Sequence, residues 1–190
     1  MNYKELFTRT ITLLSTPQKA WEEIREETDG ALLGAFVYPM IGFCGLTMFV
    51  GMLFGNGVED FNFQLVMTKC CDVFISLFGG FFLSSYFVNY YGIRVLGRNA
   101  EEMGMCQKLV GYSMSVLFVL NILSGLFPTF FVLRWILQFY TIYVVWEGAK
   151  ELMGVSEKHL LTYTVVCSAI ILVSPALIGF LFNWLGKMVN

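Results

Sequence analysis

Long apolar runs separated by short polar loops fill the chain from residue 30 onward. A membrane-spanning helix needs about 20 mainly apolar residues, because the hydrocarbon core of a bilayer is roughly 30 Å thick. A helix also pairs the backbone polar groups of a spanning segment within that segment. The pattern therefore predicts an all-α, polytopic membrane domain over residues 30–190. Its five transmembrane helices are expected at about 31–55, 73–93, 109–127, 129–147 and 160–184.

The longest run, Leu109 to Trp146, is central to this prediction. It carries a single charge, Arg134, and is interrupted near its middle by Gly-Leu-Phe-Pro-Thr at 125–129. Because the run is too long for one span, it predicts two helices joined by a turn too short to hold a domain. We expect this helical hairpin to form the core on which the other spans pack.

Residues 1–29 follow a different pattern, in which apolar and charged positions recur with a helical period. The apolar face of a first short helix consists of Tyr3, Phe7, Ile11 and Leu14. Thr16 can cap a second helix that begins at Pro17. Both helices are too short and too charged to span a bilayer. We expect a cytoplasmic amphipathic segment that lies on the membrane surface, although packing on the ends of the spans fits the pattern equally well.

Small residues four apart in two of the spans permit the close approach of another helix. They are Gly51 and Gly55 in the first span, and Ser76, Gly80 and Ser84 in the second. Pro39 and Pro175 lie inside the first and last spans. Each is expected to kink its helix, because proline cannot donate a backbone hydrogen bond.

Basic residues are unevenly distributed along the chain, and this predicts the orientation. Cytoplasmic loops are enriched in Lys and Arg. With the N-terminus inside, the inner side holds nine basic residues, namely Lys4, Arg9, Lys19, Arg25, Arg94, Arg98, Lys108, Lys150 and Lys158. The outer flanks hold three, namely Lys69, Arg134 and Lys187. We therefore expect a multi-pass protein of the cell inner (cytoplasmic) membrane, with the N-terminus cytoplasmic and the C-terminus outside.

Composition agrees with a membrane protein. Hydrophobic residues make up 57% and charged residues 14% of the 190 positions, whereas soluble domains are about 25% charged. The net charge of −2 gives no reason to expect a nucleic-acid partner. The five cysteines lie in or beside apolar runs at no regular spacing, so we expect small core residues and no cofactor or metal site.

Polar groups inside a membrane are costly and are functional candidates by default. Asn121 and Arg134 lie at similar depth on the two arms of the predicted hairpin, and Gln138 is one turn beyond Arg134. Asp72 falls near the same outer boundary, within reach of Arg134 by snorkelling. We predict an intramembrane polar cluster of Asp72, Asn121, Arg134 and Gln138. The cluster either holds the spans together by polar contacts or binds a lipid headgroup or a solute.

Nothing in the sequence favours catalysis. His159 is the only histidine and lies at the start of the last span beside Lys158. A metalloprotease helix would need two histidines four residues apart. A serine hydrolase would need a buried Ser–His pair and an oxyanion site. We expect a protein that is not an enzyme.

Four stretches resemble the sequence pattern of bacterial Yip1-domain proteins. Residues 16–24, Thr-Pro-Gln-Lys-Ala-Trp-Glu-Glu-Ile, are similar to a Ser/Thr-Pro-x-x-x-Trp-x-x-Ile motif of that family. Tyr38-Pro39 resembles its apolar-Pro start of the first span. Residues 108–113 resemble its Gly-Tyr element, and residues 147–156 the loop before its last span. The motif-like positions are Pro17, Trp21, Pro39, Gly111 and Tyr112. The family often has a proline shortly after Gly-Tyr, where this chain has Met114-Ser115.

The resemblance covers nearly the whole chain, in the right order, and implies a small integral membrane protein with a cytoplasmic N-terminus. We expect a non-enzymatic, Yip1-like scaffold that organises the membrane or binds proteins or lipids. Its expected partners are membrane lipids, other membrane proteins or further copies of the chain. The alternative is a small transporter or channel for a solute or lipid. Transporters usually show inverted repeats, and we find no internal repeat in this sequence.

Overall fold

The computed structural model describes residues 3–26, 32–55, 62–97 and 103–189, and these residues form an all-helical bundle. Its elements, in chain order, are α1 (Tyr3–Ser15), α2 (Pro17–Arg25), the π-helix η1 (Leu33–Val37), α3 (Tyr38–Gly55), α4 (Phe63–Leu96), α5 (Met103–Ser113), α6 (Ser115–Leu126), the 3₁₀ turn η3 (Pro128–Phe130), α7 (Phe131–Leu137), α8 (Tyr140–Glu151) and α9 (Glu157–Val189). Among the described residues, four helical stretches are long and apolar enough to cross a membrane: Leu33–Phe54, Phe63–Arg94, Met103–Leu126 and Glu157–Met188.

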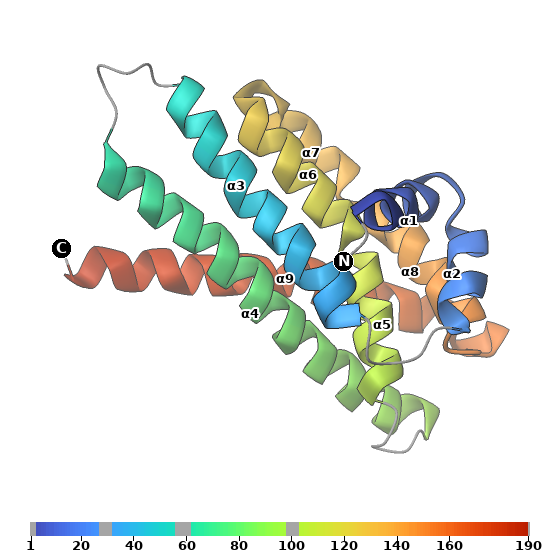
Figure 1. The fold of residues 1–190 in the computed structure, drawn as a ribbon. Helices are drawn as coiled ribbons and strands as arrows, with labels where there is room; N and C mark the ends of the chain where they lie inside the picture. The colour runs from blue at the N-terminus through green and yellow to red at the C-terminus, as the bar shows by residue number, and fades with distance from the viewer. Residues whose placement is uncertain (1–2, 27–31, 56–61, 98–102, 190) are drawn as a thin grey trace.

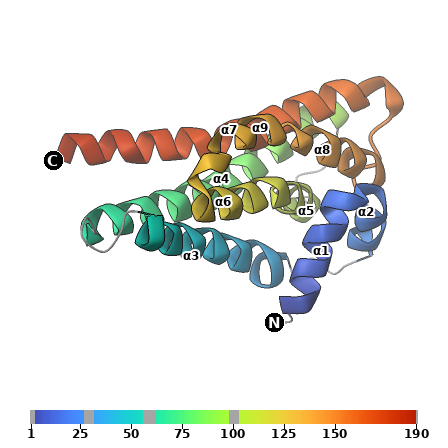
Figure 2. The same cartoon turned by 90° about the horizontal axis from the view of Figure 1, so that it is seen from above.

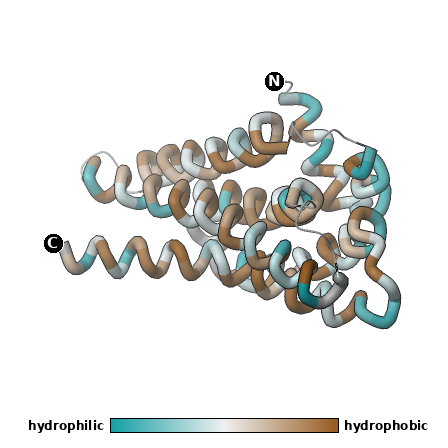
Figure 3. Tube along the Cα trace, turned by 90° about the horizontal axis from the view of Figure 1, so that it is seen from below, coloured by the Kyte–Doolittle hydropathy of each residue, from teal (hydrophilic) through white to brown (hydrophobic). Residues whose placement is uncertain are grey.

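The long helices run between two ends of the bundle (Figures 1 and 2). One end carries α1, α2 and the turn between α8 and α9. The opposite end carries the end of α3, the start of α4 and the C-terminus. Brown, apolar residues fill the middle of the long helices, and teal residues gather around α1, α2 and the α8–α9 turn (Figure 3). This distribution is the one a bilayer requires, with polar residues at the bundle ends.

The two predicted small-residue faces both meet another helix. An added Cβ at Gly51 of α3 would collide with the backbone oxygen of Gly125 in α6. On α4, a Cβ at Gly80 would lie 2.6 Å from Cγ of Pro175 in α9. The hydroxyl of Ser84, one turn further along α4, donates to the Ile170 oxygen of α9 at 3.3 Å. These crossings hold α3 against α6 and α4 against α9 because no side chain separates the backbones.

Local sequence sets several helix ends. Asn62 begins α4, and its side chain accepts a hydrogen bond from the Leu65 N–H at 3.1 Å. Gly97 ends α4 with φ 64°, a left-handed conformation that glycine adopts without steric cost. Before Pro39 the chain makes a π-helical turn in which the Tyr38 N–H donates to the Leu33 oxygen. This turn shifts the hydrogen-bond ladder by one residue just before the proline that cannot donate.

The fourth predicted span differs from the structure, and five spans are not confirmed. Residues 129–147 were expected to form one helix, but η3, α7 and α8 occupy this region, with a turn at Gln138–Phe139. At the turn the Thr141 N–H donates to Gln138 and the Ile142 N–H to Phe139, which are three-residue rather than four-residue bonds. Neither Pro nor Gly lies at this point, so hydrophobic pattern alone could not show the break.

The N-terminal segment packs on the bundle, which is one of the two arrangements left open by its sequence. Leu6, Thr10 and Leu13 of α1 are buried, and so are Ala20, Trp21 and Ile24 of α2. The predicted Thr16 cap is not formed: its hydroxyl is directed back to the Thr12 oxygen at 3.5 Å, and it makes no cap hydrogen bond to α2. Instead, the Tyr140 hydroxyl of α8 donates to the Leu14 oxygen at 2.8 Å and ties down the end of α1.

Candidate functional site

Motif-like residues that are far apart in the chain meet where α2, α5 and α8 pack together. We define the Trp21–Tyr112 junction as Arg9, Trp21, Phe36, Tyr112 and Gly148. Trp21 is 0% exposed. Its indole N–H donates to the Val144 backbone oxygen of α8 at 2.9 Å. A buried indole N–H needs such a partner, and the bond fixes α2 to α8.

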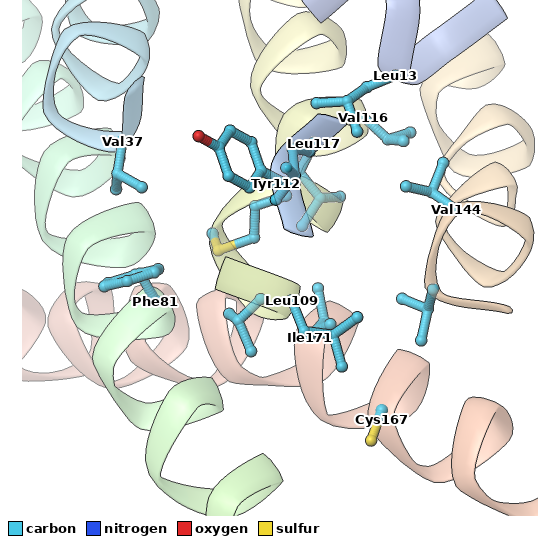
Figure 4. Packing of buried hydrophobic residues seen from close by; sticks show 14 of the residues in the cluster. Leu13, Val37, Phe81, Leu109, Tyr112, Val116, Leu117, Val144, Cys167 and Ile171 are labelled. Carbon is cyan, nitrogen blue, oxygen red and sulfur yellow. The ribbon is translucent and has the colours of Figure 1, made fainter. Parts of the chain in front are cut away.

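Tyr112 lies at the centre of the junction, with aromatic or cationic groups on several sides. Its ring meets Trp21 edge to face, with ring centroids 6.2 Å apart, and Phe36 at 4.7 Å. The Arg9 guanidinium lies 5.7 Å from the ring centroid, and its Nη1 donates to the Tyr112 hydroxyl at 3.4 Å. One side chain of α5 therefore contacts residues from α1, α2 and η1. Figure 4 shows Tyr112 between Val37 on one side and Leu117 and Val116 on the other.

Two glycines make this packing possible. A Cβ at Gly148 would lie 2.7 Å from Cε2 of Trp21 and 2.6 Å from Cδ1 of Leu109. A Cβ at Gly111 would lie 3.1 Å from Leu32 and Val37 side-chain atoms. Real Cβ contacts are almost never as short as those at Gly148, so indole and helix α8 touch only because this residue has no side chain.

The two motif prolines shape the chain entering the junction. Pro17 is buried and occupies the first turn of α2, where its missing N–H costs nothing. Pro39 follows the π-helical turn that carries Phe36. Sequence reasoning singled out neither Phe36 nor Gly148. Gly148 lies within the motif-like stretch 147–156, and this was the feature of the sequence that could have identified it. No feature of the sequence marked Phe36.

Two of the four residues of the predicted polar cluster, Asp72 and Asn121, make side-chain hydrogen bonds within their own helices. Asp72 accepts a hydrogen bond from Ser76 in its own helix at 3.2 Å and faces Gly179 of α9. The Asn121 amide donates to Leu117 in its own helix at 2.8 Å. Arg134 is partly buried on α7, and Gln138 lies in the turn after it. Within the described residues, no hydrogen bond or ion pair joins the four, so their action as one cluster stays a prediction.

The described residues contain no group of three or more His, Cys, Asp or Glu side chains arranged to hold a metal ion. His159 is exposed at the start of α9. The chemistry that the junction offers is hydrogen bonding, aromatic packing and a cation over a ring, all of which hold α1 and α2 in place.

Long apolar helices with polar ends and a clamped pair of N-terminal amphipathic helices define a multi-pass, all-α membrane protein. The Yip1 domain family model matches residues 11–178, and the chain belongs to this family of generally non-enzymatic membrane-trafficking proteins. The matched range contains nearly the whole junction, from Ile11 past Gly148. Comparisons with curated proteins and with solved structures gave no match.

Proposed function

We propose that this Yip1-domain protein is a non-enzymatic scaffold that shapes the inner leaflet of a bacterial cytoplasmic membrane. The observation that carries the proposal is the position of α1, which is fixed to the bundle while part of its apolar surface stays uncovered. Tyr3, Phe7 and Ile11 are 56%, 47% and 64% exposed, whereas Leu6, Thr10 and Leu13 are buried.

The buried and exposed apolar residues of α1 are neighbouring halves of one broad apolar arc, by helical periodicity. One half packs on the bundle, and the other is continuous with α3, since the rings of Tyr3 and Phe7 lie 6.2 and 5.5 Å from the ring of Phe43. An interfacial helix buries its apolar face at the boundary of headgroups and acyl chains. Because α1 is held by the Tyr112 and Tyr140 contacts, it would occupy area in one leaflet only.

The polar side of α1 supports a contact with lipid headgroups. A cleft of about 280 Å³ between α1 and α2 is lined by Lys4, Glu5, Thr8, Arg9, Thr12 and Glu23. It presents both cationic and anionic groups. A phosphoethanolamine headgroup carries both charges as well, so we infer that zwitterionic inner-leaflet lipids bind here.

The orientation we propose has the N-terminus inside and the C-terminus outside, with α7 and α8 together forming a broken fifth crossing. Support comes from the chain path in Figure 2, where α8 runs back toward α2 and α9 runs away from it to the C-terminus. Support also comes from the basic residues, because Lys4, Lys19 and Lys150 all belong to helices that meet at the α1–α2 end.

The test is vesicle shape. Purified protein reconstituted into phosphatidylethanolamine–phosphatidylglycerol vesicles should give narrow or tubular membranes under electron microscopy. The double substitution Phe7→Ser and Ile11→Ser should return them to large, smooth vesicles, because it removes two of the three exposed apolar side chains and leaves the buried half intact. Ser15→Ala, at an exposed polar position of the same helix outside the headgroup cleft, is the matched control. Equal membrane curvature from the native chain, the double variant and the control would refute the proposal that α1 shapes the leaflet.

A leak assay in the same vesicles tests the second candidate function, that of a small transporter or channel. The break at Met114, within the stretch Met103–Leu126, and the break at Gln138–Phe139, within the fourth predicted span, favour it, because discontinuous helices form many transporter sites. A scaffold should leave the leak rate of trapped small solutes unchanged relative to empty vesicles. A solute-selective leak would instead support transport.

A further inference from the structure

Some buried hydroxyl groups of the bundle have no hydrogen-bond partner. Most helical Ser and Thr side chains here donate to the carbonyl one turn back, as Thr47, Ser85 and Ser174 do. Five described Ser and Thr hydroxyls do not and are buried at 0–2% exposure: Ser113, Ser115, Thr141, Thr164 and Ser168. A buried polar atom without a partner is costly and needs an explanation, such as an ordered water.

Four of these five belong to α5, α8 and α9, and α8 packs against both of the other helices. Ser113 is one turn after Leu109, which faces Gly148 of α8. Thr141 is two turns before Gly148 on the same stripe of α8. Thr164 and Ser168 follow Leu160 at four-residue steps on α9. Figure 4 shows Leu109 and Ile171 together, with Cys167 and Val144 nearby.

The depth of these residues in the bundle also agrees. Leu160 of α9 lines a cleft with Trp146 of α8. Counting outward from this pair along the antiparallel helices brings Thr141 level with the turn between Thr164 and Ser168. Ser115 points to a different side of its helix from Ser113, since residues two apart are not on one face.

Two helix breaks lie next to these residues in the chain. The α5–α6 helix is interrupted at Met114, next to Ser113, and α7 ends at the Gln138–Phe139 turn, two residues before Thr141. At the second break the Phe139 and Thr141 N–H groups bond to oxygens three residues back instead of four. In membrane helices, Ser and Thr side chains and ordered waters accompany such irregular turns.

We propose that Ser113, Thr141, Thr164 and Ser168 form a hydrated site between α5, α8 and α9 that binds ordered water. The ligand class follows from the donors: the four side chains are neutral and each can both donate and accept, so they match a neutral molecule that does the same. This inference does not depend on the scaffold function.

Radiolytic hydroxyl-radical labelling in lipid nanodiscs tests the site directly. Radicals formed from a bound water oxidise neighbouring sulfur groups. Two sulfur side chains adjoin the site in the chain, Met114 next to Ser113 and Cys167 next to Ser168, and both are 0% exposed. Met40 and Cys44 on α3 are matched controls at 1% exposed. We expect Met114 and Cys167 to be oxidised several-fold faster than the controls. Equal, slow oxidation of all four would show a dry interior and overturn the proposal.

A pair of near-isosteric variants gives an independent readout. Thr164→Val with Ser168→Ala should lower the oxidation of Cys167 and lower Tm by a few degrees, because bound water loses its partners. In a dry core the same change would raise Tm, since it removes unpaired hydroxyls. Thr47→Val, whose hydroxyl is already paired within α3, is the control and should leave Cys167 oxidation unchanged. A higher Tm without loss of labelling would contradict a hydrated site.

Discussion

Gly148→Ala tests whether the Trp21–Tyr112 junction is built on direct contact between an indole and a helix backbone. In the native chain, the new Cβ would lie 2.7 and 2.8 Å from Cε2 and Cζ2 of Trp21. Overpacking of this kind costs about 1–3 kcal/mol. The alanine also gains about 1 kcal/mol of helix propensity over glycine inside α8, so we expect a net destabilisation of about 0–2 kcal/mol.

The destabilisation caused by Gly148→Ala should be smaller when the indole is absent. Trp21→Leu removes the ring that meets Gly148 and the N–H that bonds the Val144 oxygen. That substitution alone should cost several kcal/mol, below the roughly 3–5 kcal/mol typical of a buried Trp→Ala change. In its background, the new Cβ of Gly148→Ala no longer meets the indole. It still meets Cδ1 of Leu109, the far end of a flexible side chain, and keeps the propensity gain. The expected coupling free energy is about 1–3 kcal/mol.

Reversible unfolding in mixed micelles, followed by far-ultraviolet circular dichroism, measures the free energy of unfolding of the native chain, the two single variants and the double variant. Gly42→Ala is the matched control, since Gly42 lies inside α3 and a Cβ there meets nothing within 4 Å. Gly42→Ala should be neutral, or stabilising by the same amount, whether position 21 holds Trp or Leu. The free-energy changes of Gly42→Ala and Trp21→Leu should simply add. If those of Gly148→Ala and Trp21→Leu also add, the indole does not pack on α8, and the junction described above is wrong.

Three further predictions address the rest of the molecule. A reporter fused after Asn190 should be active outside the cytoplasm, and cytoplasmic activity would show an even number of crossings. Arg134→Ala and Asp72→Ala should add within about 0.5 kcal/mol in unfolding experiments, because the structure joins them by no ion pair, and strong coupling would instead restore the predicted cluster. Gly51→Ala should destabilise the protein by at least about 1–3 kcal/mol, because its Cβ meets the Gly125 backbone, whereas a neutral result would show that α3 and α6 are not in contact there.

Hydrophobic pattern predicted the long helices because each is decided by length and apolar content alone. The stretches Leu33–Phe54, Phe63–Arg94, Met103–Leu126 and Glu157–Met188 all contain a predicted span or most of one. The helix ends were less predictable. α4 continues outward to the Asn62 cap, through Lys69 and Asp72, because a helix stays hydrogen-bonded where polar residues meet the interface.

The fourth span could not be predicted in the form it takes. Its sequence is as apolar as its neighbours, and it contains no Gly or Pro between Thr129 and Trp146. The break at Gln138–Phe139 depends on how α7 and α8 fit against the rest of the bundle. The described side chains of α7 are mostly exposed, whereas Val144, Val145 and Ala149 of α8 are fully buried. Tertiary packing of one half without the other is invisible to a sliding hydropathy pattern.

The N-terminal segment shows the same limit for an amphipathic helix. Periodicity identified the apolar face of α1, but it could not say which part of that face meets protein and which meets lipid. The long-range contacts of Tyr112 with Arg9, Trp21 and Phe36 decide this, and they come from parts of the chain that the helical pattern treats separately. The motif-like spacing of Pro17 and Trp21 marked the right residues. Its physical meaning appears only once Gly148 is seen to leave room for the indole, so the motif describes a joint between helices α2, α5 and α8.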